Sequence, residues 1–176
     1  MDASALLREQ LRDSHAALER TVDGLGVAEL AWVPPGTANP IGATLAHIVV
    51  AEDLLVHAIL TGSAPIGLST WAGRTGLSEP MPLPGPGWGD YPAWTRRVTV
   101  DLAGLLDYAH ATWESTNVYL SSLTEGDLDR VLDLAALGQG SRTLGWAVAR
   151  LLVAHCDSIT GEIACLKGLQ GRGGYG

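Results

Sequence analysis

The sequence predicts an all-α fold, a four-helix bundle with a long Gly/Pro-rich crossover between the second and third helices. Four segments carry apolar residues at helical spacing, and no polar–apolar alternation is long enough to predict a useful β-strand. Residues 63–90 combine many glycines and prolines, which exclude a long helix there. Four helices with one long connection define a bundle whose sites lie between facing helices.

The first helix is predicted over residues 4–23. Its apolar stripe includes Leu7, Leu11 and Leu18, charged residues cover the opposite side, and Gly24 follows the last turn. A short further turn is expected over residues 27–30. The periodicity therefore predicts a surface helix with one face in the core.

The second helix begins with a start signal, because Asn39 suits an N-cap and Pro40 the first helical position. It is expected to end near Leu60, with Gly62 as the stop. His47 and Ala51 share one face of it. The crossover that follows carries Trp71 and Trp88, which indicate that it packs onto the bundle.

The third helix is predicted over residues 91–123 and the fourth over residues 143–169. Residues 127–130 are expected to add one short turn between them, and residues 171–176 form a loose tail. The chain shows no internal repeat and no linker that divides it, so a single domain over residues 1–176 is predicted.

The composition excludes some functions. A net charge of −8 argues against a nucleic-acid partner, because phosphate binding needs a basic surface. Charged residues such as Glu52 and Arg150 interrupt the apolar runs, so no membrane span is expected, and the N-terminus shows no signal-peptide pattern. The expected location is the cytoplasm. Cys156 and Cys165 lie too far apart on one helix to bridge and are expected to be reduced.

The most informative residue is His155, because of the residue four positions later. Histidines at positions i and i+4 would lie on one helix face and hold a metal between them. The second position is occupied by Ile159, which has no lone pair to donate. His47 on the second helix faces the same bundle interior in this arrangement, so the pattern is that of a helix-borne metal site with one ligand missing.

Two carboxylates are candidates to complete this site. Glu162 shares the helix face of His155 and Ile159, and Glu52 lies on the second helix. The alternative is that His47 and His155 are hydrogen-bonded core residues. His15 lies beside an apolar stripe, whereas His57 and His110 are expected to be partly exposed. The candidates to line a pocket are Ile159, Glu52, Trp71 and Trp88.

The residues around the two histidines resemble the DinB/YfiT-like superfamily. The similar segments are Leu45-Ala-His47-Ile-Val-Val-Ala-Glu52-Asp53 after Asn39-Pro-Ile-Gly42, and His155-x-x-x-Ile159-x-Gly161-Glu162-Ile163. Residues 70–76 and 161–171 are most similar to an actinobacterial branch, and the use of ten arginines against one lysine resembles a high-GC bacterium.

The resemblance implies a four-helix bundle that is often dimeric. It also implies a divalent metal, zinc or nickel, held by His47, His155 and residue 159. Some relatives are thiol transferases that use mycothiol or bacillithiol. This chain departs from the pattern at Ile159, which puts metal binding in doubt.

Three functions follow as hypotheses. The favoured one is a protein with a degraded metal site that binds and transforms a small molecule without a cofactor, with His47, His155 or Glu162 as acid–base groups. The second is a metal-dependent, mycothiol-type S-transferase in which Glu162, Glu52 or water replaces the missing ligand. The third is a non-catalytic protein that binds a small molecule in the same pocket.

Overall fold

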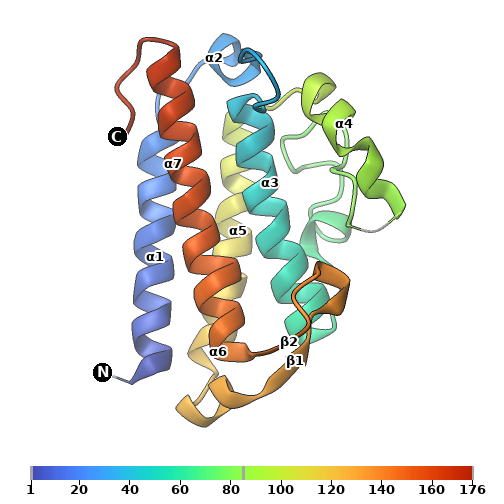
Figure 1. The fold of residues 1–176 in the computed structure, drawn as a ribbon, viewed down its shortest axis with the longest axis vertical. Helices are drawn as coiled ribbons and strands as arrows, with labels where there is room; N and C mark the ends of the chain where they lie inside the picture. The colour runs from blue at the N-terminus through green and yellow to red at the C-terminus, as the bar shows by residue number, and fades with distance from the viewer. Residues whose placement is uncertain (1, 85, 176) are drawn as a thin grey trace.

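Four long helices lie side by side and form a bundle, as predicted (Figure 1). The computed structural model describes residues 2–84 and 86–175, so Met1, Gly176 and Gly85 of the predicted crossover lie outside the described residues. The long helices are α1 (Ala3–Val22), α3 (Ile41–Asp53) with its continuation η1 (Leu54–Thr61), α5 (Leu102–Ser121), and the last helix, built from α6 (Leu144–Ala147), η6 (Val148–Val153) and α7 (Ala154–Leu169). The short helix α2 (Val27–Ala31) follows α1, close to its predicted bounds.

Side-chain caps and a glycine fix several helix ends. Asp2 accepts a hydrogen bond from the Ala5 N–H at 2.7 Å, and Thr143 accepts one from the Trp146 N–H at 3.2 Å. The N-cap of α3 is Pro40, one residue later than predicted. Gly62 ends η1 with φ of +69°, the left-handed conformation that terminates many helices.

Two of the long helices change from α to π geometry partway along. The π segments are η1 and η6, one on the second long helix and one on the last. No sequence pattern indicated them, because the residues of both segments fit an uninterrupted α-helix equally well. Such segments frequently occur near functional sites, and these two face each other across the pocket described below.

The predicted third helix is wrong in one respect, because it is two helices. The helix α4 (Tyr91–Arg97) ends before an extended stretch, and α5 begins only at Leu102. Val98, Thr99 and Val100 are β-branched and favour extended backbone. Val100 forms an isolated antiparallel bridge with Leu77 of the crossover, which holds this stretch outside a helix.

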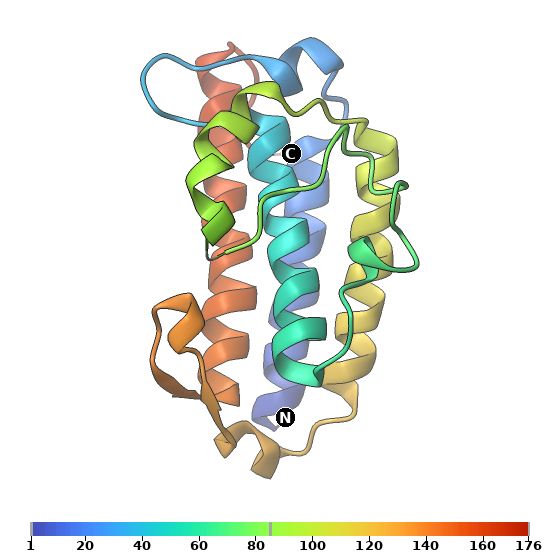
Figure 2. The same cartoon turned by 90° about the vertical axis from the view of Figure 1, so that its right-hand side faces the viewer.

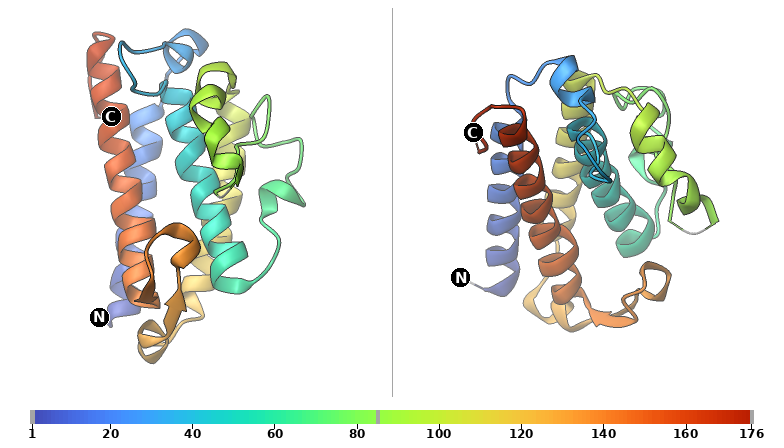
Figure 3. Two further views of the ribbon diagram at one scale, coloured as in Figure 1. Left: turned by 45° about the vertical axis from the view of Figure 1, so that its right-hand side comes forward. Right: turned by 45° about the horizontal axis from the view of Figure 1, so that its top comes forward.

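The crossover packs against the outer face of α3 and α5 (Figure 2). It contains two short 3₁₀ turns, η2 (Ile66–Leu68) and η3 (Pro86–Asp90), where no helix was predicted. The connection between α5 and the last helix contains a turn close to the one predicted over residues 127–130, together with elements that were not predicted. It contains η4 (Glu125–Asp129), η5 (Ala135–Leu137) and a small antiparallel hairpin of β1 (Val131–Asp133) and β2 (Ser141–Thr143), placed at the lower end of the last helix (Figure 3).

The second long helix lies at the centre of the molecule. Residues 41–61 are long and apolar enough to cross a membrane by length and composition, although the sequence analysis had excluded a span. However, 67% of that stretch is buried inside the bundle, which is the environment of a core helix. Ile41, Leu45 and Val49 are each at most 1% exposed. The helix that carries His47 is therefore held on nearly all sides.

Candidate functional site

The bundle brings His47 and His155 together. His47 lies in the middle of α3, and His155 lies at the start of α7, directly after the π segment η6. Their ring centroids are 5.2 Å apart and their planes are tilted by 73°. The two histidines that the sequence analysis placed at the centre of the site are thus neighbours across facing helices.

Two aromatic residues from the end of the crossover stand over His47. Tyr91 and Trp88 stack on each other with ring centroids 4.5 Å apart. Their centroids lie 5.7 Å and 6.3 Å from that of His47. Trp88 was a predicted pocket residue, whereas Tyr91 was not, because it was expected only as the first residue of the third helix.

A cavity of about 200 Å³ opens beside the two imidazoles, and we call it the histidine pocket. It lies between the second and last long helices and is closed by parts of the crossover and of the hairpin loop. Besides His47, His155 and Trp88, its lining consists of Ala51, Leu54, Leu55, Ile59, Met81, Pro84, Leu137, Gln139 and Leu151. No charged side chain lines it in the described part of the chain, so it favours an uncharged ligand.

Both histidines are neutral at pH 7. Burial, with a smaller contribution from the neighbouring His155, lowers the pKa of His47 to about 4. Burial also lowers the pKa of His155, although a hydrogen bond with the Leu151 backbone acts in the opposite direction. The Nδ1 atom of His47 is buried and has no hydrogen-bond partner among the described residues. A buried polar atom of this kind is a candidate contact for a ligand.

Ile159 and Glu162 lie outside the lining of the histidine pocket. Ile159 is half-buried and packs against the main apolar core. The carboxylate of Glu162 is exposed. Together with burial, its negative charge raises the pKa of Tyr91 to about 12, so the Tyr91 hydroxyl stays protonated. The structure therefore places Glu162 near Tyr91 rather than beside the two histidines.

Glu52 is turned away from the histidine pocket toward α1. It is 3% exposed, and one of its carboxylate oxygens lies 2.8 Å from Nε2 of His15, which is 7% exposed. The other oxygen, Oε1, is buried without a partner among the described residues. The His15 ring stacks on Trp113 at 4.5 Å. Glu52 is one position past Ala51 on the helix, and this 100° rotation directs it to a different neighbour.

Trp71 is also separate from the pocket. Its ring lies 6.1 Å from that of Tyr108, and the Arg74 guanidinium lies over it at 4.9 Å. Of the four residues predicted to line the pocket, the structure therefore brings only Trp88 to it.

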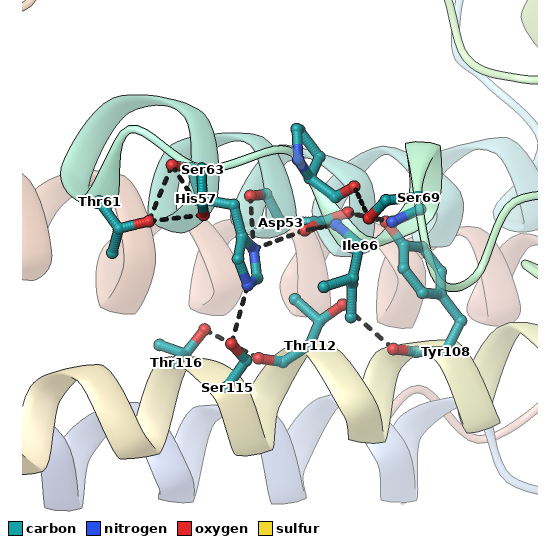
Figure 4. A network of polar contacts seen from close by, with 12 residues as sticks. Asp53, His57, Thr61, Ser63, Ile66, Ser69, Tyr108, Thr112, Ser115 and Thr116 are labelled. Atoms are coloured by element: carbon teal, nitrogen blue, oxygen red, sulfur yellow. Dashed lines mark hydrogen bonds and ion pairs between the residues drawn. The ribbon is translucent and has the colours of Figure 1, made fainter.

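A buried network on Asp53 ties the crossover to the bundle (Figure 4). Asp53 accepts hydrogen bonds from the backbone N–H groups of Ile66 and Gly67, at 2.9 and 2.8 Å, and from the Tyr108 hydroxyl at 2.5 Å. Its Oδ1 also lies 2.6 Å from Nδ1 of His57.

The other ring nitrogen of His57, Nε2, lies 2.8 Å from the Ser115 hydroxyl. The prediction that His57 is partly exposed is wrong, because this network buries it to 8% exposure. His110 is exposed, as predicted. The Asp53–His57–Ser115 order is that of a hydrolytic triad, but Ser115 lines none of the three main cavities of the described residues, and its N–H lies within α5. We interpret the network as structural.

The histidine pair does not fit the three-ligand metal centre that the resemblance implies. A catalytic zinc site uses three protein ligands. The third position holds the apolar Ile159, Glu162 is exposed, and Glu52 is paired with His15. Among residues 2–84 and 86–175, no three His, Cys, Asp or Glu side chains are grouped closely enough to hold a metal ion.

The helical bundle with two histidines facing each other between its second and last long helices agrees with the fold and histidine positions that the DinB-like resemblance implies. A sequence profile of the DinB superfamily matches residues 10–157, and this chain belongs to that superfamily.

A crystal structure of a conserved protein from Enterococcus faecalis is similar in fold, with a TM-score of 0.80. The similarity covers 96% of this chain and 97% of that one, at 24% sequence identity. It therefore shows the fold alone. No curated protein matches the sequence.

Proposed function

We propose that this protein binds a small, uncharged molecule in the histidine pocket and acts on it without a metal, through His47 and His155. The observation that carries the proposal is the pairing of two neutral imidazoles with an apolar pocket. The rings are 5.2 Å apart, and the pocket of about 200 Å³ has no charged lining residue in the described chain. Such a pocket provides binding by apolar contact and orientation by a few polar groups.

The pKa of His47 decides which chemistry the pair performs best. A pKa of about 4 lies three units below pH 7, so placing a proton on His47 at that pH costs about 4 kcal/mol. His47 is therefore poorly suited to act as a general acid at pH 7. A neutral imidazole instead donates one N–H and accepts at its other nitrogen, and so it polarises a carbonyl or orients a hydroxyl of the ligand. His155 faces the same space and completes the pair.

Tyr91 adds a third polar group near the site. Its hydroxyl remains protonated at neutral pH because its pKa is raised to about 12. The stacked Trp88 and Tyr91 rings restrict access of water to His47. Water exclusion strengthens the hydrogen bonds that the imidazoles form with a ligand.

The test measures binding and turnover together. A panel of uncharged carbonyl compounds and alcohols is screened by thermal shift, and each hit is followed by calorimetry and product analysis. The panel is run on wild type and on the variants His47→Phe, His47→Gln and His155→Phe. His110→Ala is the matched control, because His110 is exposed and far from the pocket.

We expect the two Phe variants to lose at least tenfold in affinity or rate, with partial retention in His47→Gln, which keeps a hydrogen-bonding group. Equal behaviour of all variants and wild type toward every hit would refute the proposal. Binding without turnover in wild type would instead support the non-catalytic hypothesis. The metal-dependent transferase hypothesis has less support, because no third protein ligand faces the pair in the described chain.

A further inference from the structure

A second cavity lies directly beside the histidine pocket. It measures about 270 Å³ and lies between α3 and the crossover. Leu54 and Met81 line both cavities. The two spaces are therefore adjacent and are separated at these two side chains.

Met81 belongs to a short segment, residues 80–84, that we call the strap. The strap passes across α3 (Figure 2). Pro80 and Leu83 line the second cavity, Pro84 lines the histidine pocket, and Met81 lines both. Three of its five residues are prolines, which have no N–H to donate. No backbone group of residues 80–84 forms a hydrogen bond with another described residue. Of its side chains, Met81 is buried to 6% exposure, whereas Leu83 is 43% exposed.

The strap is thus held over the bundle mainly by one buried side chain. Its preceding residue, Glu79, is fixed, because the Glu79 carboxylate pairs with Arg97 at 2.9 Å. Methionine is unbranched and has three rotatable bonds, so it changes its shape more easily than other core residues. A ligand can displace the Met81 side chain without breaking any backbone hydrogen bond of the strap.

We infer that the ligand of the histidine pocket has an elongated, apolar tail that passes Met81 and lies in the second cavity beneath the crossover. This inference rests on the proposed function, which places the reacting group of the ligand at His47 and His155. The second cavity is lined mostly by apolar residues, including Val50, Leu68, Leu77 and Leu83. Its charged lining residues are the carboxylates Asp53 and Glu79, with no lysine or arginine among the described residues, which disfavours an anionic tail.

The volume of the histidine pocket limits the length of the ligand that it can hold. At about 30 Å³ for a water-sized group, the histidine pocket holds about seven such groups. A longer straight chain must therefore extend past Met81 or remain in solvent. Each methylene that becomes buried tightens binding by about fourfold, whereas a methylene left in solvent adds nothing.

The experiment measures the affinity of straight-chain primary alcohols, from butanol to decanol, by calorimetry on the full chain. Two variants separate the cavities. Leu77→Trp fills the second cavity, since Leu77 lines that cavity and not the histidine pocket. Leu137→Trp fills the histidine pocket, since Leu137 lines only that one. Circular dichroism and Tm establish that each variant is folded, and Leu77→Ile, Leu137→Ile and Met81→Ala complete the set.

In wild type we expect affinity to increase with each added methylene beyond seven heavy atoms. Leu77→Trp removes this increase for the long alcohols and leaves the short ones unchanged, whereas Leu77→Ile retains it. Met81→Ala keeps the increase, because it joins the two cavities. Leu137→Trp weakens every chain length by at least tenfold.

One further result would overturn the tail inference alone, and another would overturn the proposed function. An affinity that levels off at about seven heavy atoms in both wild type and Met81→Ala overturns the tail inference and leaves the proposed function standing. Failure of the short alcohols to bind wild type, or their indifference to Leu137→Trp, contradicts the proposed function itself.

Discussion

One substitution at residue 159 tests the proposal that this site lacks the third ligand of a metal centre. Ile159 lies one helical turn after His155, in the position where a histidine would share its helix face. We expect Ile159→His to bind about one zinc ion per chain, because it supplies the third nitrogen ligand beside His47 and His155. Elemental mass spectrometry of the purified variant measures this.

The control for that experiment is Asp157→His. Asp157 is exposed and is rotated by 200° from His155 on the helix, so a histidine there faces away from the pair. Zinc bound equally by both variants, or by neither, would show that the two histidines do not form the frame of a metal site.

The lowered pKa of His47 predicts a pH dependence of stability. Its pKa is about 4 in the folded protein and 6.5 ordinarily, so the unfolded state binds more protons between these values. The free energy of unfolding therefore falls as the pH falls from 6.5 toward 4, by up to about 3 kcal/mol from this residue. Urea titrations of wild type and His47→Gln at several pH values isolate the contribution of His47. The carboxylates titrate in both proteins, so their contribution cancels in the comparison. Parallel stability curves for the two proteins would contradict the buried, neutral His47.

At the scale of residues, the sequence predicted the site in part. Helical spacing and the family resemblance led to His47 and His155, which the structure brings together. The same reasoning could not place Tyr91, because its approach to His47 depends on the end of a crossover that has no regular periodicity. The contact between Glu52 and His15 could not be predicted either, because it depends on how α1 packs against α3.

Among the elements, the crossover depends on Asp53. Asp53 is 1% exposed and accepts hydrogen bonds from two backbone N–H groups and from Tyr108. We expect Asp53→Asn to lower the free energy of unfolding by about 3 kcal/mol, because the amide group cannot accept the bonds that the second carboxylate oxygen accepts. Chemical denaturation measures the loss. Asp107→Asn, at an exposed position of α5, is the matched control, and an equal effect of both would rule out the anchoring role.

The junction before α5 provides a second prediction for an element. Gly76 has φ of +72°, and a Cβ there would lie 2.3 Å from the Leu105 backbone nitrogen. Gly73 has φ of +75°, but a Cβ there would meet nothing within 4 Å. We expect Gly73→Ala to cost about 1 kcal/mol from backbone strain, and Gly76→Ala to cost about 2 kcal/mol more from the clash with α5. Thermal unfolding of both variants measures the difference, and similar costs would show that the clash relaxes without penalty.

Elements with a continuous apolar stripe and clear end signals were predicted well. The first, second and last long helices lie within a few residues of their expected bounds. The prediction of one continuous third helix was wrong, because the bridge between Leu77 and Val100 joins distant segments. Local helix propensity does not report such a contact. The π segments were missed for a related reason, since the same apolar residues fit α and π geometry.

For the whole molecule, the arrangement predicts a gradient of local stability. The helix α3 is buried on nearly all sides, so its amides are expected to exchange with solvent only on global unfolding. The amides of Met81 and Leu83 form no hydrogen bond with the described chain and are expected to exchange within the shortest labelling times. Hydrogen exchange followed by mass spectrometry compares the two. Protection of the strap amides equal to that of α3 would contradict the description of the strap as held by one side chain.

The central position of the most apolar helix also has a consequence for biosynthesis. Residues 41–61 leave the ribosome before α5 and the last helix, which bury them, have been made. The hundred or so residues from Gly62 to Leu169 take roughly 5 to 20 s at about 5–20 residues per second. During that interval the nascent chain presents a segment apolar enough for a membrane. We therefore expect the yield of the protein in cells to fall when this segment is left uncovered during translation.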